Sequence, residues 1–183
     1  MENNYIEIKS KKDAKIEFEH VQIPEETDEI GYFAFSRCEN LKSVTIPDSV
    51  TIIGDYAFEG CVNLKSVIIP NSVTEIGCHA FEGCKNLENV IIPNDITIIE
   101  KGVFRNCKNI KSIIIPNNAR IIEEGAFMKC ENLKSVTIPN SVTSIGACAF
   151  YGCENLETVT ILNNARHFND YFTFPQNCKV IRM

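Results

Sequence analysis

The sequence predicts a strand-rich α/β repeat solenoid, in which one short structural unit recurs along the chain. The stretch at residues 64–86, LKSVIIPNSVTEIGCHAFEGCKN, is repeated with a period of 23 residues and without insertions. The copies start at Phe18, Leu41, Leu64, Leu87, Ile110, Leu133 and Leu156. Positions 1, 4, 6, 10, 13, 17, 18 and 21 of most copies are apolar, so we expect them to share one core. In a chain of 183 residues this array leaves no room for a second fold.

We expect one domain with three parts: an N-terminal cap at residues 1–17, the repeats at residues 18–161 and a C-terminal cap at residues 162–183. Caps are expected because the end coils of an array would otherwise expose the core in cross-section. Residues 5–8, YIEI, alternate like a short strand within the first cap.

The last copy departs from the pattern, which indicates where the second cap begins. Leu162 replaces a proline, and Phe168, Phe172 and Phe174 are displaced from the usual aromatic position. Val180 and Ile181 are expected to add a final strand to the edge of a sheet.

Positions 3 to 6 of each copy, such as Ser-Val-Thr-Ile at residues 43–46, are predicted to form a strand with positions 4 and 6 facing inward. Identical strands one coil apart would pair in parallel, about 4.8 Å from each other, in a continuous sheet roughly 30 Å long. Proline at position 7 has no N–H for the ladder and therefore turns the chain out of the sheet. These corner prolines are Pro24, Pro47, Pro70, Pro93, Pro116 and Pro139.

A second short extended segment is expected at positions 10 to 13, which are rich in β-branched residues. The segment after it, DYAFEGC at residues 55–61, has the spacing of one helical or 3₁₀ turn. The phenylalanine at position 18 should point inward and stack on its counterparts. This column comprises Phe35, Phe58, Phe81, Phe104, Phe127 and Phe150.

Six of the nine cysteines fall at position 21, one in each coil, which indicates a buried column of reduced thiols. They are Cys38, Cys61, Cys84, Cys107, Cys130 and Cys153. A zinc site needs four converging ligands, usually from paired Cys-x₂₋₄-Cys clusters, whereas Cys78 with Cys84 and Cys148 with Cys153 are separated by five and four residues. Cys78, Cys148 and Cys178 lie off the column, so oxidation should begin there. No metal is predicted.

The net charge of −6 gives no broad attraction to nucleic acid or to anionic membranes, so neither is expected as a partner. No apolar run approaches the length of a membrane span, and residues 1–17 are too polar for a secretory signal. We therefore expect a cytoplasmic protein. Unconventional export, or a signal that is missing from this sequence, would place it at the cell surface instead.

No catalytic residue or cofactor is predicted. The histidines, His20, His79 and His167, occupy different repeat positions in different coils and cannot converge. Cys78 and His79 are adjacent, but a nucleophilic pair needs both groups within hydrogen-bond reach and a third group that orients them. Motifs for dinucleotides, phosphates, zinc hydrolysis and serine hydrolysis are absent from the sequence.

The recurring pattern L-x-x-V-x-I-P-x-S-V-x-x-I-G-x-x-A-F-x-G-C resembles the 23-residue leucine-rich repeat of BspA-like proteins, over residues 18 to about 161. This resemblance implies a curved, right-handed superhelix with a parallel sheet on its concave side. It also implies a role in binding proteins, since some relatives are surface adhesins of bacteria and parasitic protists. It brings no catalytic residue with it.

A binding surface is expected at the outward strand positions, 3 and 5. Position 5 is isoleucine in three consecutive copies, Ile68, Ile91 and Ile114, with Thr45 and Thr137 on either side. Charges at position 2 flank this apolar row: Lys65, Glu88, Lys111 and Lys134. An apolar centre with a polar rim is typical of an interface, although isoleucine also simply favours strands.

The sequence therefore predicts a non-catalytic scaffold that binds a protein or peptide on the concave sheet, with the lysines selecting acidic neighbours. Two alternatives stay open: a structural or self-associating module, and a surface adhesin.

Overall fold

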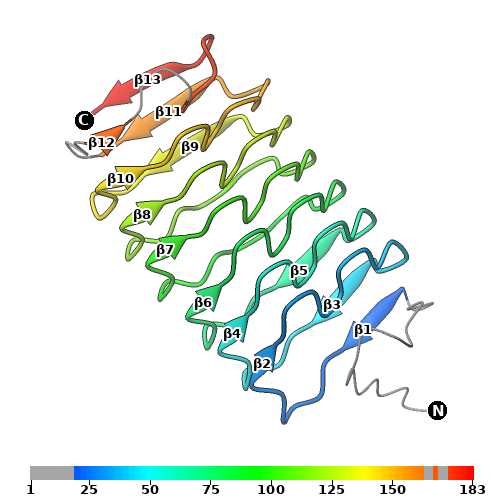
Figure 1. Ribbon diagram of the computed structural model, residues 1–183. Coiled ribbons are helices and arrows are strands. Elements are labelled where there is room, and N and C mark those ends of the chain that lie inside the picture. Colours follow the sequence, from blue (N-terminus) through cyan, green and yellow to red (C-terminus); the bar gives the residue numbers. More distant parts are fainter. Residues whose placement is uncertain (1–18, 163–166, 169–172) are drawn as a thin grey trace.

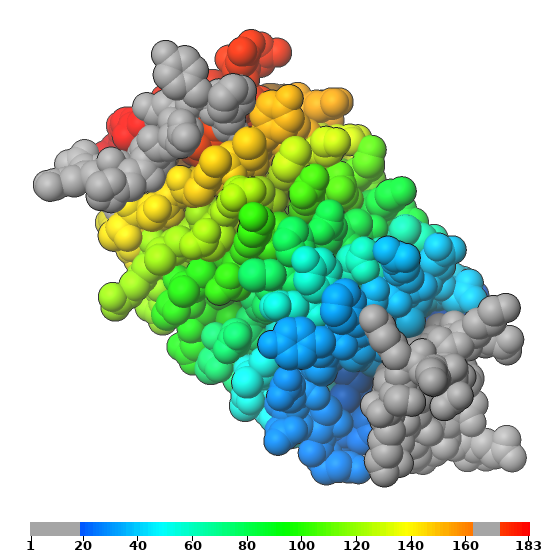
Figure 2. Space-filling model, viewed as in Figure 1, coloured from blue at the N-terminus to red at the C-terminus, as the bar shows by residue number. Residues whose placement is uncertain are grey.

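The computed structural model describes residues 19–162, 167–168 and 173–183, which form a solenoid of stacked coils (Figure 1). The coils follow one another in chain order, and Figure 2 shows them as parallel ridges from blue to red. All the described strand pairs are parallel. Partners in the repeats are equivalent positions of successive copies, as in Val44 with Val67. The predicted strand-rich repeat solenoid is confirmed. The predicted N-terminal cap, residues 1–17, lies outside the described residues.

One side of the solenoid carries the strands at repeat positions 3 to 6. They are β1 (His20–Gln22), β3 (Ser43–Thr45), β5 (Ser66–Ile68), β9 (Ser135–Ile138), β11 (Thr158–Ile161) and β13 (Lys179–Arg182). They form two sheets, in the orders β1-β3-β5 and β9-β11-β13. Alternation within these strands buries position 4 and exposes position 5, as in Val67 and Ile68.

A second side carries shorter strands at positions 12 and 13. They are β2 (Glu29–Ile30), β4 (Ile52–Ile53), β6 (Glu75–Ile76), β7 (Ile98–Ile99), β8 (Ile121–Ile122), β10 (Ser144–Ile145) and β12 (His167–Phe168). They also form two sheets, β2-β4-β6 and β7-β8-β10-β12. The second extended segment that the sequence predicted is therefore present.

The prediction of one continuous sheet at positions 3 to 6 is wrong. In the copies that start at residues 87 and 110, no strand forms at these positions, and a single bridge, between Ser66 and Asn89, extends the first sheet. The coil-to-coil bonds lengthen here: Lys65 N to Lys42 O is 3.0 Å, but Lys111 N to Glu88 O is 3.5 Å. On the second side, no backbone hydrogen bond joins residues 74–77 to residues 97–100.

We attribute this break to larger side chains in the copy at residues 87–109. Ile96, Glu100 and Val103 stand where the preceding copy has Val73, Gly77 and Ala80. Ile96 and Val103 are buried, so their extra carbon atoms must be accommodated between neighbouring coils. We call the boundary between the copies at residues 64–86 and 87–109 the seam.

The prediction of a helical or 3₁₀ turn at residues 55–61 is also wrong: the described residues contain no helix, so the fold is a β-solenoid rather than α/β. Positions 16 and 20 adopt left-handed backbone, as Tyr56 (φ 56°) and Gly60 (φ 71°) do in this copy. A left-handed residue ends a right-handed helix. Successive tight turns result, and they are bonded to the next coil, as in Phe58 N to Ala80 O at 2.7 Å.

The predicted phenylalanine column is confirmed as the thick part of the core. Neighbouring rings are stacked, with centroids 5.0 to 5.7 Å apart. Beside it, each position-21 thiol from Cys61 onward donates to the carbonyl of a phenylalanine in the preceding coil; Cys107 Sγ is 3.0 Å from Phe81 O. Cysteine therefore both fills the space and satisfies a buried acceptor.

The C-terminal end confirms the predicted final strand and corrects two details. β13 pairs with β11, with Thr158 beside Lys179. These partners are 21 residues apart in the sequence, whereas partners in the repeats are 23 residues apart. Phe174 is not displaced from the aromatic column, because its ring stacks 5.5 Å from that of Phe150. Cys178 packs against the core, and burial raises the pKa of the Cys153 thiol to about 12. Phe172 lies outside the described residues.

Phe104→Ala is expected to lower the free energy of unfolding by about 3 to 5 kcal/mol, because it leaves a cavity in the middle of the column. Phe104 stacks on both Phe81 and Phe127, whereas Phe35 stacks only on Phe58 among the described residues. Phe35→Ala should therefore cost less, since each coil contacts only its neighbours. Urea unfolding of both variants measures the difference. Equal losses would contradict nearest-neighbour stacking.

Thiol labelling under native conditions should separate the buried thiols of the column from the other cysteines. Burial raises the pKa of the Cys107 and Cys130 thiols well above the ordinary value, so both reactive thiolate and access are scarce. Cys38, at the first described coil, is half-buried, so the prediction that it is buried with the column is wrong. The hydrogen bond with the Cys61 thiol lowers the pKa of Cys38, so Cys38 should react earliest in a mass-spectrometric time course. Fast labelling of Cys107 and Cys130 in the folded protein, or a large loss of stability on adding reductant, would rule out a reduced buried column.

Candidate binding surface

Three exposed isoleucines form a row across successive coils, which we call the isoleucine stripe: Ile68, Ile91 and Ile114. Their exposed fractions are 80%, 72% and 74%. Their neighbours at positions 4 and 6 are buried, which fixes position 5 outward. A single exposed apolar side chain is ordinary, but three adjacent ones form a contiguous patch, which is typical of an interaction site.

Threonines continue the row at both ends, as the sequence predicted. Thr45 of β3 is the direct ladder partner of Ile68 in β5. Thr137, in β9, occupies the same position in the copy that follows Ile114, and both threonines are exposed. The row therefore changes from apolar to polar within one coil at each end.

The charges at position 2 are not all free. Lys111 Nζ lies 2.8 Å from Glu88 Oε2 in an exposed ion pair, and this hydrogen bond and charge lower the pKa of the Glu88 carboxyl. Lys65 and Lys134 are exposed and form no ion pair with any described residue. The rim thus has two available cations, one near each end of the isoleucine stripe, around a neutralised centre.

A groove of about 350 Å³ adjoins the isoleucine stripe at Ile114. Its lining includes Ser112, Ser135, Thr137 and Leu162. Sequence reasoning missed this groove, although Leu162 was a signal: it replaces the corner proline and is partly exposed. The groove could accept one aliphatic side chain beside the isoleucine stripe.

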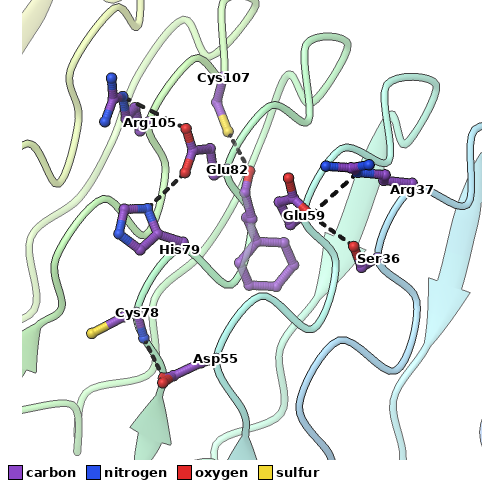
Figure 3. A network of polar contacts seen from close by, with 10 residues as sticks. Ser36, Arg37, Asp55, Glu59, Cys78, His79, Glu82, Arg105 and Cys107 are labelled. Carbon is purple, nitrogen blue, oxygen red and sulfur yellow. Dashed lines mark hydrogen bonds and ion pairs between the residues drawn. The ribbon is translucent and has the colours of Figure 1, made fainter. Parts of the chain in front are cut away.

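Cys78 and His79 do not form a nucleophilic pair (Figure 3). His79 Nδ1 lies 2.6 Å from Glu82 Oε2, and its ring stacks on Tyr56. The Cys78 thiol instead lies 3.6 Å from Glu100 Oε2. Burial and the charges of Glu100 and Asp55 raise the pKa of Cys78, which disfavours the thiolate. A nucleophile needs the opposite shift.

The other polar contacts in this region join neighbouring coils. Glu59 accepts a hydrogen bond from Ser36 of the preceding coil, and Arg105 lies beside Glu82 (Figure 3). Asp55 Oδ1 accepts from the backbone N–H of Cys78, at 2.7 Å. We therefore assign these groups to coil stacking.

Among the described residues, no three metal-ligating side chains are grouped closely enough to hold an ion. The described part of the chain also contains no helix that is long and apolar enough to cross a membrane.

A model of the BspA type leucine rich repeat region matches residues 6–130 and 97–182, with six copies. The chain belongs to this family. The resemblance inferred from the repeat pattern is thus confirmed. No curated protein gave a significant match to the chain.

Solved structures of bacterial leucine-rich repeat proteins share the fold of this BspA-type chain. A T. pallidum leucine rich repeat protein is 30% identical, with a TM-score of 0.73, over 82% of this chain and 78% of that one. A leucine-rich repeat protein from Bacteroides ovatus is 33% identical, with a TM-score of 0.60, over 89% of this chain and 55% of that one.

A leucine rich cell surface protein from Faecalibacterium prausnitzii is 26% identical, with a TM-score of 0.51, over 79% of this chain and 60% of that one. The BspA-type chain thus spans little more than half the length of the second and third of these proteins.

Glu100→Gln should stabilise the protein at neutral pH. Burial, and the nearby charges of Glu123 and Glu75, raise the pKa of Glu100 in the fold, against the opposing hydrogen bond from Cys78. A raised pKa means that the folded state binds the proton more tightly. The stabilising contribution of protonated Glu100 is therefore fully present below the ordinary carboxyl pKa of about 4.5. It is lost as pH rises through the pKa of Glu100 in the folded state.

The melting temperature of Glu100→Gln should exceed that of wild type at pH 7, and the difference should shrink towards pH 4. Glu154→Gln is the matched control, because Glu154 is exposed and its side chain forms no hydrogen bond or ion pair with a described residue. A pH-independent difference would mean that the charge of Glu100 is not what opposes folding.

Proposed function

We propose that this BspA-type chain is a non-catalytic scaffold that binds a protein or peptide at the isoleucine stripe. The main observation behind the proposal is that three exposed isoleucines occupy the same repeat position in successive stacked coils. The inward positions are occupied by core whatever the function, so the outward strand positions are where a partner can be selected. The family resemblance implies that this face is the concave one.

The polar surroundings support the same proposal. Binding energy in an interface comes mainly from a buried apolar centre, and charged groups at the rim govern specificity and association rate. Lys65 and Lys134 lack intramolecular ion-pair partners among the described residues, so they are suited to acidic groups on the partner. The neutral Lys111–Glu88 pair between them does not oppose an apolar ligand.

The scaffold is proposed to act in the cytoplasm, where its buried thiols would stay reduced. A location at the cell surface, as an adhesin-like module, is the alternative. It is favoured by the similar protein that is described as a cell surface protein.

Self-association is the other candidate function, and a sheet edge favours it. β13 is the outermost strand of the sheet β13-β11-β9 in the described part of the chain. Such an edge can add a strand from another molecule. Sedimentation velocity at micromolar concentration separates the two functions, because a binding module should be monomeric.

Ile91→Asp is expected to abolish partner binding while the protein stays folded. The side chain is exposed, so the free energy of unfolding should change by less than about 1 kcal/mol. A carboxylate at the centre of an apolar interface should weaken binding at least about tenfold. The measurement is capture of partners from host extract on wild type and on the variant, followed by calorimetric titration of the purified partner.

Tyr32→Asp is the matched control. Tyr32 has a similar exposed fraction but lies in the first described coil, away from the isoleucine stripe. It should leave the affinity unchanged. If Ile91→Asp binds the purified partner as tightly as wild type does, the isoleucine stripe is not the binding site.

A further inference from the structure

The coils that carry the isoleucine stripe are spaced more widely than the other repeats. The phenylalanine rings of these coils lie 5.6 Å apart for Phe81 and Phe104, and 5.7 Å apart for Phe104 and Phe127. Elsewhere in the repeats, the ring spacing is 5.0 or 5.1 Å. On the strand side of the same copies, Glu88 N lies 3.1 Å from Lys65 O and Lys111 N lies 3.5 Å from Glu88 O. Since ordinary strand spacing is about 4.8 Å, the isoleucine stripe advances by about 5 Å per coil.

This spacing is close to the pitch of an α-helix, which is 5.4 Å. A helix lying along the solenoid axis would place one side chain per turn, from positions i, i+4 and i+7, beside successive isoleucines. These three positions span about 10.5 Å along the helix axis, which is close to the two steps of the isoleucine stripe, about 10 Å. An extended segment in the same direction places same-face side chains about 6.7 Å apart, so it would lose register by about 1.7 Å at each coil.

The available charges fit the same ligand. Lys65 and Lys134 are three coils apart, about 15 Å, which corresponds to about 10 residues of helix. Both lie at position 2, which is three residues from the isoleucine position, or about 10 Å along an extended chain. That offset is comparable to the width of a helix with its side chains. Acidic residues on one flank of a helix, near its two ends, would therefore reach both lysines.

A second copy of the chain, docked face to face, fits less well. An apolar patch of this kind covers a few hundred Å² at most. A stable interface between two folded proteins buries about 800 Å² on each side. Both partners would also bring Lys65 and Lys134 to the contact, where like charges repel.

We propose that the isoleucine stripe receives an amphipathic α-helix of the partner, lying along the solenoid axis. The helix carries aliphatic side chains at i, i+4 and i+7 and acidic residues near both ends of that row. One aliphatic side chain enters the groove beside Ile114. This inference rests on the proposed function, since it specifies the partner of the same surface.

The test uses the full chain labelled at isoleucine δ1-methyl groups, observed by NMR, which detects millimolar affinities. The probe is a 16-residue alanine-based peptide with leucines at i, i+4 and i+7 and a glutamate flanking each end of that row. One control peptide has the same composition with the leucines distributed around the helix. A second keeps the leucine pattern but has a proline in the centre, which breaks the helix.

The first peptide should shift the methyl signals of Ile68, Ile91 and Ile114 and leave that of Ile98 unchanged, because Ile98 is partly exposed on the other side of the solenoid. Its dissociation constant should be at least tenfold lower than that of either control peptide. The double variant Lys65→Glu, Lys134→Glu should bind the first peptide more weakly than wild type does, because its glutamates would face like charges. Equal shifts with all three peptides, or no shift with any, would overturn the helix proposal.

The native partner separates this inference from the proposed function. If Ile91→Asp loses the partner but the bound segment is extended rather than helical by NMR, the helix proposal is wrong and the scaffold proposal stands. If Ile91→Asp keeps the partner, the binding site is wrong, whatever the peptides do. A helical bound segment that contacts Ile68 and Ile114 supports both proposals.

Discussion

The structure depends on one constraint: every residue must be accommodated by the residue one coil before it and the residue one coil after it. Phe58 stacks between Phe35 and Phe81, Cys84 donates to the carbonyl of Phe58, and Asn86 donates its amide to Asn63. The same contacts recur in the following coils. Because each contact joins equivalent positions, an insertion of one residue within a coil would put all of them out of register. This explains why the repeat length is kept at 23 residues across copies whose sequences differ.

The sequence was sufficient to predict the features that follow from periodicity. Alternation placed Val67 inward and Ile68 outward, and the single cysteine per coil indicated a column. The isoleucine stripe was predicted by the same reasoning, because an outward position stays outward in every copy. Periodicity failed where the backbone adopts a conformation that the side chains do not favour. Tyr56 and Cys148 have left-handed backbone although their residue types do not favour it. The glycine at the equivalent position of another copy, Gly102, was a signal of left-handed backbone that the sequence reasoning did not use.

The break in the sheets could not be predicted either, because it depends on a sum of small volumes. Val103 in place of alanine, or Ile96 in place of valine, is a conservative change when each position is considered alone. Both are buried in one coil, and together they coincide with longer hydrogen bonds and wider ring spacing. The charge pairing at the rim could have been predicted, since Lys111 and Glu88 occupy position 2 of successive copies and the expected register places them side by side. The available cations are therefore fewer than the lysines at position 2.

The seam is an internal boundary of the solenoid, and the hydrogen bonds across it are unevenly distributed around the coil. On the turn side, the bonds across it are as short as elsewhere: His79 N to Lys101 O and Phe81 N to Val103 O are both 2.9 Å. On the strand sides, they are reduced to the bridge at Asn89 and its neighbouring contact. The seam is therefore bonded mainly along its turn side, although the core packs continuously across it. Fewer backbone hydrogen bonds would have to break to part the coils on the strand sides here than between the copies that precede the seam. Because Ile68 lies before the seam and Ile91 after it, any parting of the coils there also changes the distance between them.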